Sequence, residues 1–325
     1  MSKRINLQRF ATGNMIDRTG AEALISEQVA NEIIQGVTEQ SVVMKMGKKL
    51  PNMSKKKYRM PILDMLPMAY WVDGDSGMKQ TSKMQWKNKF IVAEELAVII
   101  PIPDAVVDDA DYDIWGEVKP RAIDALHNKF DAAVLFGTDA PSSWRQGIVP
   151  SATAANNTVT LAASANLYDK IMGEDGVIAK VEDSGYLVTG HMADVTMRAK
   201  LRGLKDTTGQ PIFRNGMNEA TNYTLDGATI DFPRNGSFDK TQALMVSGDF
   251  SQLVYSIRQD VTYKVLTEAT IVDPATKEVV YALAQQDMVA LRIVMRLGWE
   301  VPNPVNAMKP TEAERFPFAV LKVGE

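Results

Sequence analysis

The stretch DIWGEVKPRAIDALHNKFDAAVLFG, residues 113–137, decides the fold of this chain. Its apolar residues recur at intervals of three and four, the spacing of one helix face, until Gly137 interrupts the pattern. Residues 113–136 make 24 positions, which is about 36 Å of helix at a rise of about 1.5 Å per residue. Pro120 lies inside the pattern, so it marks either the first turn of a shorter helix or a kink in a longer one. Five aspartates crowd the expected start, where the helix dipole favours negative charge: Asp104, Asp108, Asp109, Asp111 and Asp113.

Two strand-like runs precede this helix and enclose a polar tip. The first is YRMPIL, residues 58–63, and the second, residues 86–102, alternates apolar and polar side chains. Between them DGDSG, residues 73–77, has the composition of a turn, so we expect a long β-hairpin. A lone hairpin is only marginally stable in water, so this one needs another surface to lie on. Three aromatic residues of the segment are expected to be exposed: Tyr70, Trp71 and Trp86.

The rest of the chain mixes short helical and strand-like pieces. Residues 1–22 are polar and aperiodic and are expected to form an extended arm, whereas residues 23–43 have the apolar spacing of one amphipathic helix, with a stop near Gly36. Later segments are predicted as a loop at 137–166, a strand at 186–190, a helix at 191–205, a turn at 225–227, and β-rich stretches at 243–269 and 288–301. The class is therefore α+β, with strands scattered along the chain.

Bulk composition narrows the functional classes. A net charge of -4 argues against a protein that wraps nucleic acid, although a surface that faces DNA without gripping it remains possible. The absence of cysteine excludes disulfides, thiolate zinc sites and a cysteine nucleophile. The longest apolar run, residues 97–102, is far shorter than the ~20 residues that span a bilayer, so we expect an intracellular protein without a membrane segment.

The search for catalytic motifs returns little. Phosphate-binding loops, the G-x-S-x-G elbow and H-E-x-x-H are all missing from the sequence. For His127 and His191, capping or interface polarity is favoured over catalysis. For the acidic cluster at 104–113, helix-start electrostatics are favoured over a cation site, and for Lys55–Lys57 a solvated strand edge is favoured over nucleic-acid contact. No catalytic, cofactor or metal residue is predicted, and the extended arm, hairpin and helix point to a chain built for assembly.

Several strings, in order along the chain, are similar to segments of one protein family: NLQRFA at 6–11, AYWV at 69–72, TSKMQW at 81–86, EVKP at 117–120 running to KFD at 129–131, LDG at 225–227, SGDF at 247–250 through YSIR at 255–258, and QDMVALR at 286–292. The set resembles the HK97-like major capsid proteins of tailed bacteriophages, in particular those of phages of Gram-positive hosts. The resemblance implies a non-enzymatic shell protein of that fold.

The resemblance also implies a division of the chain into the parts of that fold. In chain order these are an N-terminal arm and short helix (1–50), the E-loop hairpin (51–100), the P-domain with its spine helix (101–150), the A-domain (151–245), returning P-domain strands (246–310) and a C-terminal segment (311–325).

By the same resemblance, copies of the chain assemble into pentamers and hexamers of an icosahedral head around double-stranded DNA. The DNA is faced without sequence-specific binding, and the other expected partners are a portal protein and a separate scaffolding protein. The implied location is the virion capsid, assembled in the bacterial cytoplasm through a procapsid that matures. An encapsulin-type nanocompartment shell and a soluble α+β enzyme remain alternatives.

Seven residues are candidates for contacts between subunits. The aromatics Tyr70, Trp71 and Trp86 offer apolar area to a neighbour. Lys79 and Lys83 lie near the hairpin tip, and Lys87 is a third lysine of the same segment. Some members of the family join such lysines to an asparagine, here Asn303 or Asn306, but ordinary solvated lysines are favoured. Arg292 and Arg296 are expected to form ion pairs in the P-domain.

Overall fold

The computed structural model describes residues 41–72, 78–110, 113–162, 165–205 and 224–324. The predicted arm and nearly all of the predicted helix at 23–43 lie outside these residues. The described chain begins at Ser41, which caps a separate short helix that starts at Val42.

Helices and strands alternate irregularly along the chain, which confirms the α+β class. The helices are α2 (Val42–Met46), α3 (Asp104–Asp108), α4 (Ile114–Phe136), α5 (Ile148–Ala154), α6 (Leu167–Met172), α7 (Val177–Asp183) and α8 (Met197–Arg202), with 3-10 turns at Phe250–Gln252, Leu283–Gln285 and Glu312–Glu314. The strands are β1 (Lys48–Lys49), β2 (Lys57–Met65), β3 (Gln85–Val92), β4 (Glu94–Pro103), β5 (Thr158–Leu161), β6 (Gly190–Ala193), β7 (Thr224–Leu225), β8 (Ala228–Asp231), β9 (Met245–Gly248), β10 (Val254–Leu266), β11 (Thr270–Val272), β12 (Val279–Ala282), β13 (Met288–Glu300) and β14 (Phe318–Val323).

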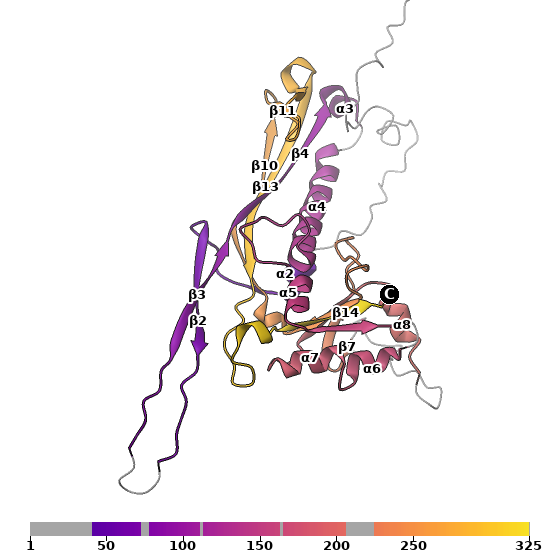
Figure 1. The fold of residues 1–325 in the computed structure, drawn as a ribbon. Helices are drawn as coiled ribbons and strands as arrows, with labels where there is room; N and C mark the ends of the chain where they lie inside the picture. The colour runs from indigo at the N-terminus through magenta and orange to yellow at the C-terminus, as the bar shows by residue number, and fades with distance from the viewer. Residues whose placement is uncertain (1–40, 73–77, 111–112, 163–164, 206–223, 325) are drawn as a thin grey trace, which may run out of the picture. The chain divides into compact units, whose positions relative to one another are not determined.

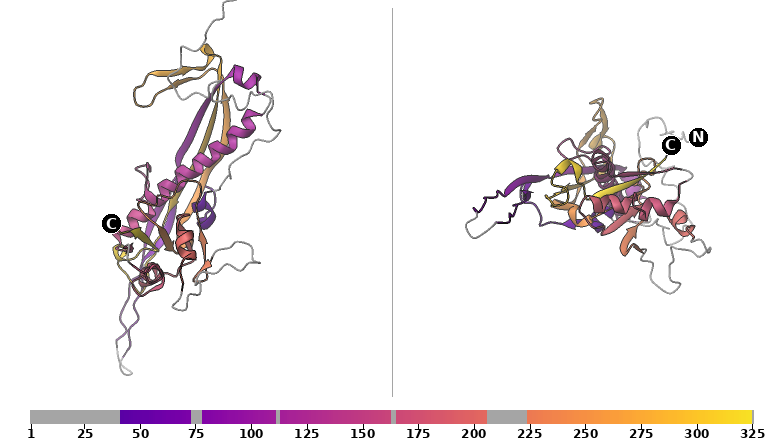
Figure 2. Two further views of the ribbon diagram at one scale, coloured as in Figure 1. Left: turned by 90° about the vertical axis from the view of Figure 1, so that its right-hand side faces the viewer. Right: turned by 60° about the horizontal axis from the view of Figure 1, so that its bottom comes forward.

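The helix α4 confirms the central prediction. It runs unbroken for 23 residues with Pro120 inside it, and Gly137 follows with a φ of 74° that favours glycine. Figure 2 shows it as one continuous helix. The sequence had suggested that all five aspartates lie at the start of this helix, and the structure shows that they do not. Asp104 opens the separate helix α3, and only Asp113 immediately precedes α4 among the described residues.

The hairpin is also confirmed, but its second strand is shorter than predicted. Strands β2 and β3 pair antiparallel from Lys57 opposite Val92 to Met65 opposite Gln85 (Figure 1). The prediction of one strand over 86–102 is wrong, because the chain leaves the hairpin at the buried Ala93 and continues as β4 in a four-stranded sheet of order β1-β10-β13-β4. The alternation of apolar and polar side chains continues past Ala93, because it depends on which face of a strand is buried and not on which strand is its partner.

The chain divides into two compact units, of which the smaller contains residues 95–126 and 260–295. It includes most of β4, the first part of α4 and the small antiparallel pair β11–β12. A cluster of buried side chains, Leu283, Met288 and Ala290, supports this pair.

The larger unit is built around a six-stranded sheet of order β5-β14-β9-β6-β8-β7. Helices α6 and α7 lie along this sheet (Figure 1), and their apolar residues join those of the strands in one core. The predicted turn at 225–227 joins β7 to β8, with both Asp226 and Gly227 at positive φ. The predicted β-rich stretches contain β9, β10 and β13.

Three local predictions in this unit are wrong. Helix α5 and strand β5 lie in the stretch predicted as a loop. No strand covers residues 186–189. The helix predicted at 191–205 is confirmed only in α8, and its predicted start is wrong because His191 lies in β6. All four residues of β6 are buried between β8 and β9, and a fully buried strand has no polar alternation to reveal it.

A buried carboxylate joins the first described residues to α4. Asp131 is fully buried and accepts hydrogen bonds from Ser41 Oγ and from the backbone N–H groups of Val42 (3.0 Å) and Val43 (3.3 Å). The Asn235 amide, from the chain after β8, donates a further bond of 2.9 Å. Desolvation raises the pKa of Asp131, against the opposing effect of these donors. Three distant segments thus meet on one side chain.

We expect Asp131→Ala to lower the free energy of unfolding by about 3 kcal/mol, because it leaves several buried donors without an acceptor. Urea unfolding followed by circular dichroism measures this change. Asp124→Ala is the matched control on the same helix, since Asp124 makes only a partly exposed 3.6 Å ion pair with Arg121. The control is expected to change stability by less than about 1 kcal/mol. Equal losses in the two variants would contradict an anchoring role for Asp131.

Candidate assembly interface

The hairpin beyond its paired root carries a concentration of exposed apolar side chains. We define the distal hairpin as the described residues 65–72 and 78–86. Among them Trp71 and Met78 are almost fully exposed, at 103% and 92%. Eight large apolar side chains of this segment are more than 40% exposed: Met65, Met68, Tyr70, Trp71, Val72, Met78, Met84 and Trp86.

Such a surface indicates a partner. Soluble monomers rarely expose contiguous apolar patches of this kind, and two extended limbs have no second layer with which to cover their own side chains. Trp71 and Trp86 are the largest of these residues, and buried aromatics dominate the energy of protein interfaces. The structure thus brings the three predicted aromatics together on one exposed segment, with Lys79 and Lys83 exposed beside them.

The sequence reasoning missed the methionines. Met65, Met68, Met78 and Met84 are all exposed on the distal hairpin, and the signal was their recurrence in a segment otherwise rich in polar residues. Methionine has an unbranched, adaptable side chain and is common on surfaces that accept more than one packing arrangement.

The two asparagines considered as partners for the tip lysines have structural roles. Asn303 accepts a hydrogen bond from the Tyr186 hydroxyl (2.8 Å) and donates one to the Arg315 carbonyl (2.9 Å). Asn306 donates to the Ser184 carbonyl at 2.8 Å. A covalent bond to either amide would disrupt these contacts, which agrees with the interpretation of Lys79 and Lys83 as solvated lysines.

Arg292 and Arg296 lie on β13, in a different sheet from the hairpin. Arg292 is exposed and forms no ion pair with another described residue, whereas Arg296 is half-buried. Their predicted ion pairs with a neighbouring subunit stay a prediction.

The two histidines differ in their surroundings. His191 is fully buried; its Nδ1 lies 2.8 Å from Ser247 Oγ, and its Nε2 lies 3.1 Å from the Leu225 carbonyl. A carbonyl can only accept, so Nε2 carries the proton and Nδ1 accepts from the serine hydroxyl. Burial lowers the pKa of His191 to about 4. On α4, the Nδ1 atom of His127 is buried without a hydrogen-bond partner among the described residues.

A serine–histidine contact is also part of a hydrolytic triad, but this pair has the wrong setting for catalysis. Both side chains are fully buried inside the six-stranded sheet, and the outer ring nitrogen meets a carbonyl where a triad has a carboxylate. The neutral imidazole therefore joins β6, β7 and β9, which agrees with the structural interpretation of His191.

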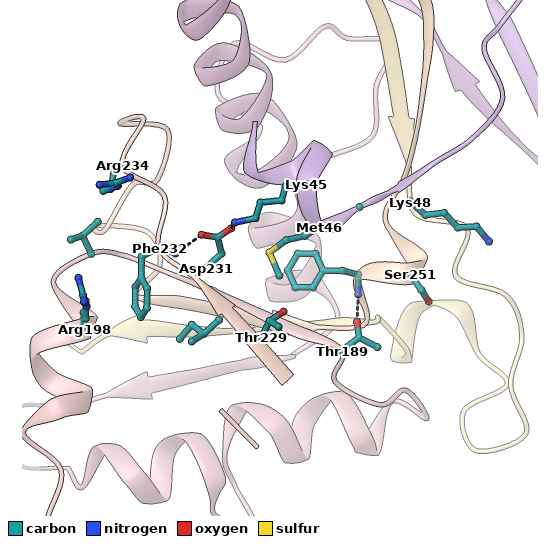
Figure 3. A pocket seen from close by; sticks show the side chains of 14 residues that line it. Lys45, Met46, Lys48, Thr189, Arg198, Thr229, Asp231, Phe232, Arg234 and Ser251 are labelled. Carbon is teal, nitrogen blue, oxygen red and sulfur yellow. Dashed lines mark hydrogen bonds and ion pairs between the residues drawn. The ribbon is translucent and has the colours of Figure 1, made fainter. Parts of the chain in front are cut away.

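A groove of about 870 Å³ lies in the larger unit between the α2–β1 segment and β8 (Figure 3). Four cations and one carboxylate line it, which gives a formal charge of 4 − 1 = +3: Lys45, Lys48, Arg198, Arg234 and Asp231. Lys45 and Asp231, the two groups best suited to exchange a proton, are bound to each other at 2.5 Å. The described lining of the groove is therefore mainly cationic.

Among the residues that the structure describes, no three His, Asp or Glu side chains gather as a metal site would require. No helix there has both the length and the apolarity to cross a bilayer.

The fold and the exposed hairpin together define a structural protein of the HK97-like shell-forming class, and comparisons with known proteins agree. The family model described as "Phage capsid family" matches residues 21–312. A chain from a solved structure of Microbacterium phage Oxtober96 is 34% identical with a TM-score of 0.79, covering 95% of this chain and 99% of that one. One from Mycobacterium phage Cain is 31% identical with a TM-score of 0.79, covering 95% and 98%. The major capsid protein of Staphylococcus phage 80alpha is 24% identical over 96% of this chain and 95% of its own length.

The chain belongs to the phage capsid family and is a major capsid protein of a tailed phage. As such it assembles with further copies of itself into the virion capsid. The findings do not favour the nanocompartment alternative.

The buried histidine makes the stability of the larger unit depend on pH, and the lowered pKa of His191 sets the direction of this dependence. In the unfolded chain a histidine takes up a proton near pH 6.5, but in the folded unit His191 does so only near pH 4. Stability is therefore lost as the pH falls from 6.5 to 4, by up to about 3 kcal/mol. We expect His191→Gln to be less stable than wild type at pH 7 and to lose less stability across this interval. Denaturant midpoints at pH 7, 5.5 and 4 measure the difference, and parallel pH profiles would contradict the assignment.

Proposed function

We propose that this capsid protein forms pentamers and hexamers of an icosahedral head around double-stranded DNA, and that the distal hairpin of each copy closes over a neighbouring copy. The observation that carries the proposal is the exposure of eight large apolar side chains on a segment that the described residues of its own subunit leave uncovered. A neighbouring copy supplies the missing layer.

Individual residues have distinct roles in this contact. Tyr70, Trp71 and Trp86 are the anchors, and full burial of such a side chain contributes about 2–3 kcal/mol. Each contact need only be modest, because a closed symmetric shell repeats it over many interfaces. Lys79 and Lys83 lie at the polar rim, where charges contribute mainly to orientation. Arg292 and Arg296 bind carboxylates of a neighbouring copy.

We assign the parts of the chain to the divisions that the resemblance implies. The six-stranded sheet is assigned to the A-domain expected over 151–245, although it also contains β9 from the segment 246–310 and β14 from the segment 311–325. The segments 101–150 and 246–310 are assigned to the P-domain with α4 as its spine helix, and 51–100 to the E-loop hairpin. Most of the arm expected over 1–50 lies outside the described residues.

The remaining partners follow from the same role. The net charge of -4 suits an inner surface that faces DNA without gripping it. A portal protein completes the head, and a separate scaffolding protein guides assembly in the bacterial cytoplasm.

The double variant Trp71→Ala/Trp86→Ala is expected to lose assembly while its subunit stays folded, because both side chains are exposed in the subunit and buried only in the shell. Sedimentation velocity and negative-stain microscopy measure assembly, and circular dichroism measures folding. The matched control, Trp71→Phe/Trp86→Phe, keeps aromatic area at both sites and is expected to retain shells. Normal shells from the alanine variant would contradict the proposed role of the hairpin.

Expression of the protein alone, and together with its neighbouring reading frames, tests the proposed partners. We expect closed, uniform shells tens of nanometres across only in co-expression, with irregular or open assemblies from the protein alone. Uniform shells of phage-head size from the single protein would show that no scaffolding partner is needed. A uniform monomer or dimer under every condition would contradict the shell itself.

A further inference from the structure

The root of the hairpin is held by a loop from the end of the chain. We name residues 301–315 the clamp loop. Its Val305 N–H donates to the Leu63 carbonyl on β2 at 3.0 Å. Lys89 on β3 donates to the Val301 carbonyl at 3.3 Å. The clamp loop therefore binds both strands of the hairpin through backbone groups.

Two ion pairs strengthen this attachment on the β3 side. Glu312 binds Lys87 at 2.9 Å through one carboxylate oxygen and Lys89 at 2.8 Å through the other. Desolvation opposes ionisation of Glu312, but hydrogen bonds from Lys89 and Lys87 prevail and lower the pKa of its carboxyl to about 2. Glu312 is therefore ionised at any pH at which the subunit is expected to be folded.

A buried arginine fixes the shape of the clamp loop. Arg315 is 2% exposed, and its guanidinium donates to four backbone carbonyls of the loop. These carbonyls belong to Asn303 (3.2 Å), Pro304 (3.0 Å), Lys309 (3.2 Å) and Pro310 (2.5 Å). The rigid fork of arginine donors suits this task, and a lysine ammonium could not reach all four acceptors.

On β2, the regular pairing with β3 ends just past Leu63, the residue that the clamp loop contacts. Met60, Ile62 and Ile91 of the root are at most 9% exposed, whereas Met65, just past the bulge, is 46% exposed. Trp86, opposite Leu63 at the end of the root, is 63% exposed. Between Leu63 and Met65 the register shifts, which leaves Asp64 as an extra residue in β2. One further pair, Met65 with Gln85, ends the ladder. In the described part of the distal limbs, the backbone N–H of Met68 crosses to Ser82 Oγ at 2.7 Å.

We propose that the clamp loop fixes the hairpin root as part of the subunit and makes the bulge at Asp64 the pivot of the distal hairpin, with Glu312 and Arg315 as positioning residues. The purpose assigned to this motion rests on the proposed contact with a neighbouring copy. The clamp itself does not depend on assembly. It lets the distal hairpin change direction toward a neighbour while the root and the sheets stay unchanged.

Hydrogen–deuterium exchange on the unassembled subunit tests the clamp directly. In the wild type we expect slow exchange at 57–63 and 87–92 and fast exchange at 65–72 and 78–84, with the step at the bulge. In Glu312→Gln, exchange in the root is expected to rise about fivefold, the combined effect of two partly exposed ion pairs. Added salt is expected to narrow the difference from wild type.

Two further variants separate the clamp from general destabilisation. Asp183→Asn removes the ion pair between Lys309 of the clamp loop and Asp183, which touches neither hairpin strand, so root exchange is expected to match wild type. Arg315→Lys keeps the charge but loses the fork, so exchange is expected to rise in both the clamp loop and the root. Exchange in the six-stranded sheet reports that each variant is folded.

Uniform exchange along the wild-type hairpin, or root exchange in Glu312→Gln equal to that of Asp183→Asn, would overturn the proposal. Assembly is a separate measurement, in which Glu312→Gln is expected to give shells of uneven diameter. Normal assembly of the double tryptophan variant would remove the proposed contact but leave the exchange step intact. If the wild-type hairpin shows no change in exchange rate at the bulge but the double tryptophan variant fails to assemble, the clamp is wrong and the proposed contact with a neighbour stands.

Discussion

Two strands joined by a tip have two faces and no second layer, and this constraint governs the rest of the molecule. At the root the subunit supplies the layer, since Met60, Ile62 and Ile91 are buried. Beyond the bulge no described residue covers Trp71, and Trp86, which pairs with Leu63 at the end of the root, is exposed as well. Burial of apolar surface is the main driving force of association, and in the proposed shell a neighbouring copy covers the distal part of the hairpin.

The larger unit holds its buried polar groups in fixed contacts, whereas the distal hairpin has few such contacts. The Asp131 carboxylate, which joins α4 to two other segments, and the neutral His191 inside the six-stranded sheet both satisfy buried polar groups within one copy. Each would be costly to break, because a buried donor or acceptor without its partner loses its full solvation. Arg315 does the same for the clamp loop. Motion is thereby confined to a segment with few such contacts.

The sequence revealed elements whose signal is local. The helix at 114–136 shows its period over 23 residues, and the hairpin shows alternation on both sides of a turn. It misplaced β6, because a strand buried on both faces has no period of its own. It merged β3 with β4, because alternation does not name the partner strand. The clamp loop could not be predicted from the sequence, because Glu312 and Lys87 are 225 positions apart and neither belongs to a motif.

The composition of the distal hairpin fits the same division of labour. In a shell of pentamers and hexamers one sequence meets neighbours in different settings, so a contact surface shaped for a single arrangement would fail in the others. Large flat aromatics such as Trp71 give area at little cost in side-chain entropy, and flexible methionines such as Met68 and Met78 fill gaps that differ between settings. A pivot adjusts the direction of the whole segment. A rigid root then keeps these adjustments from reaching the core, because close-packed interiors transmit strain.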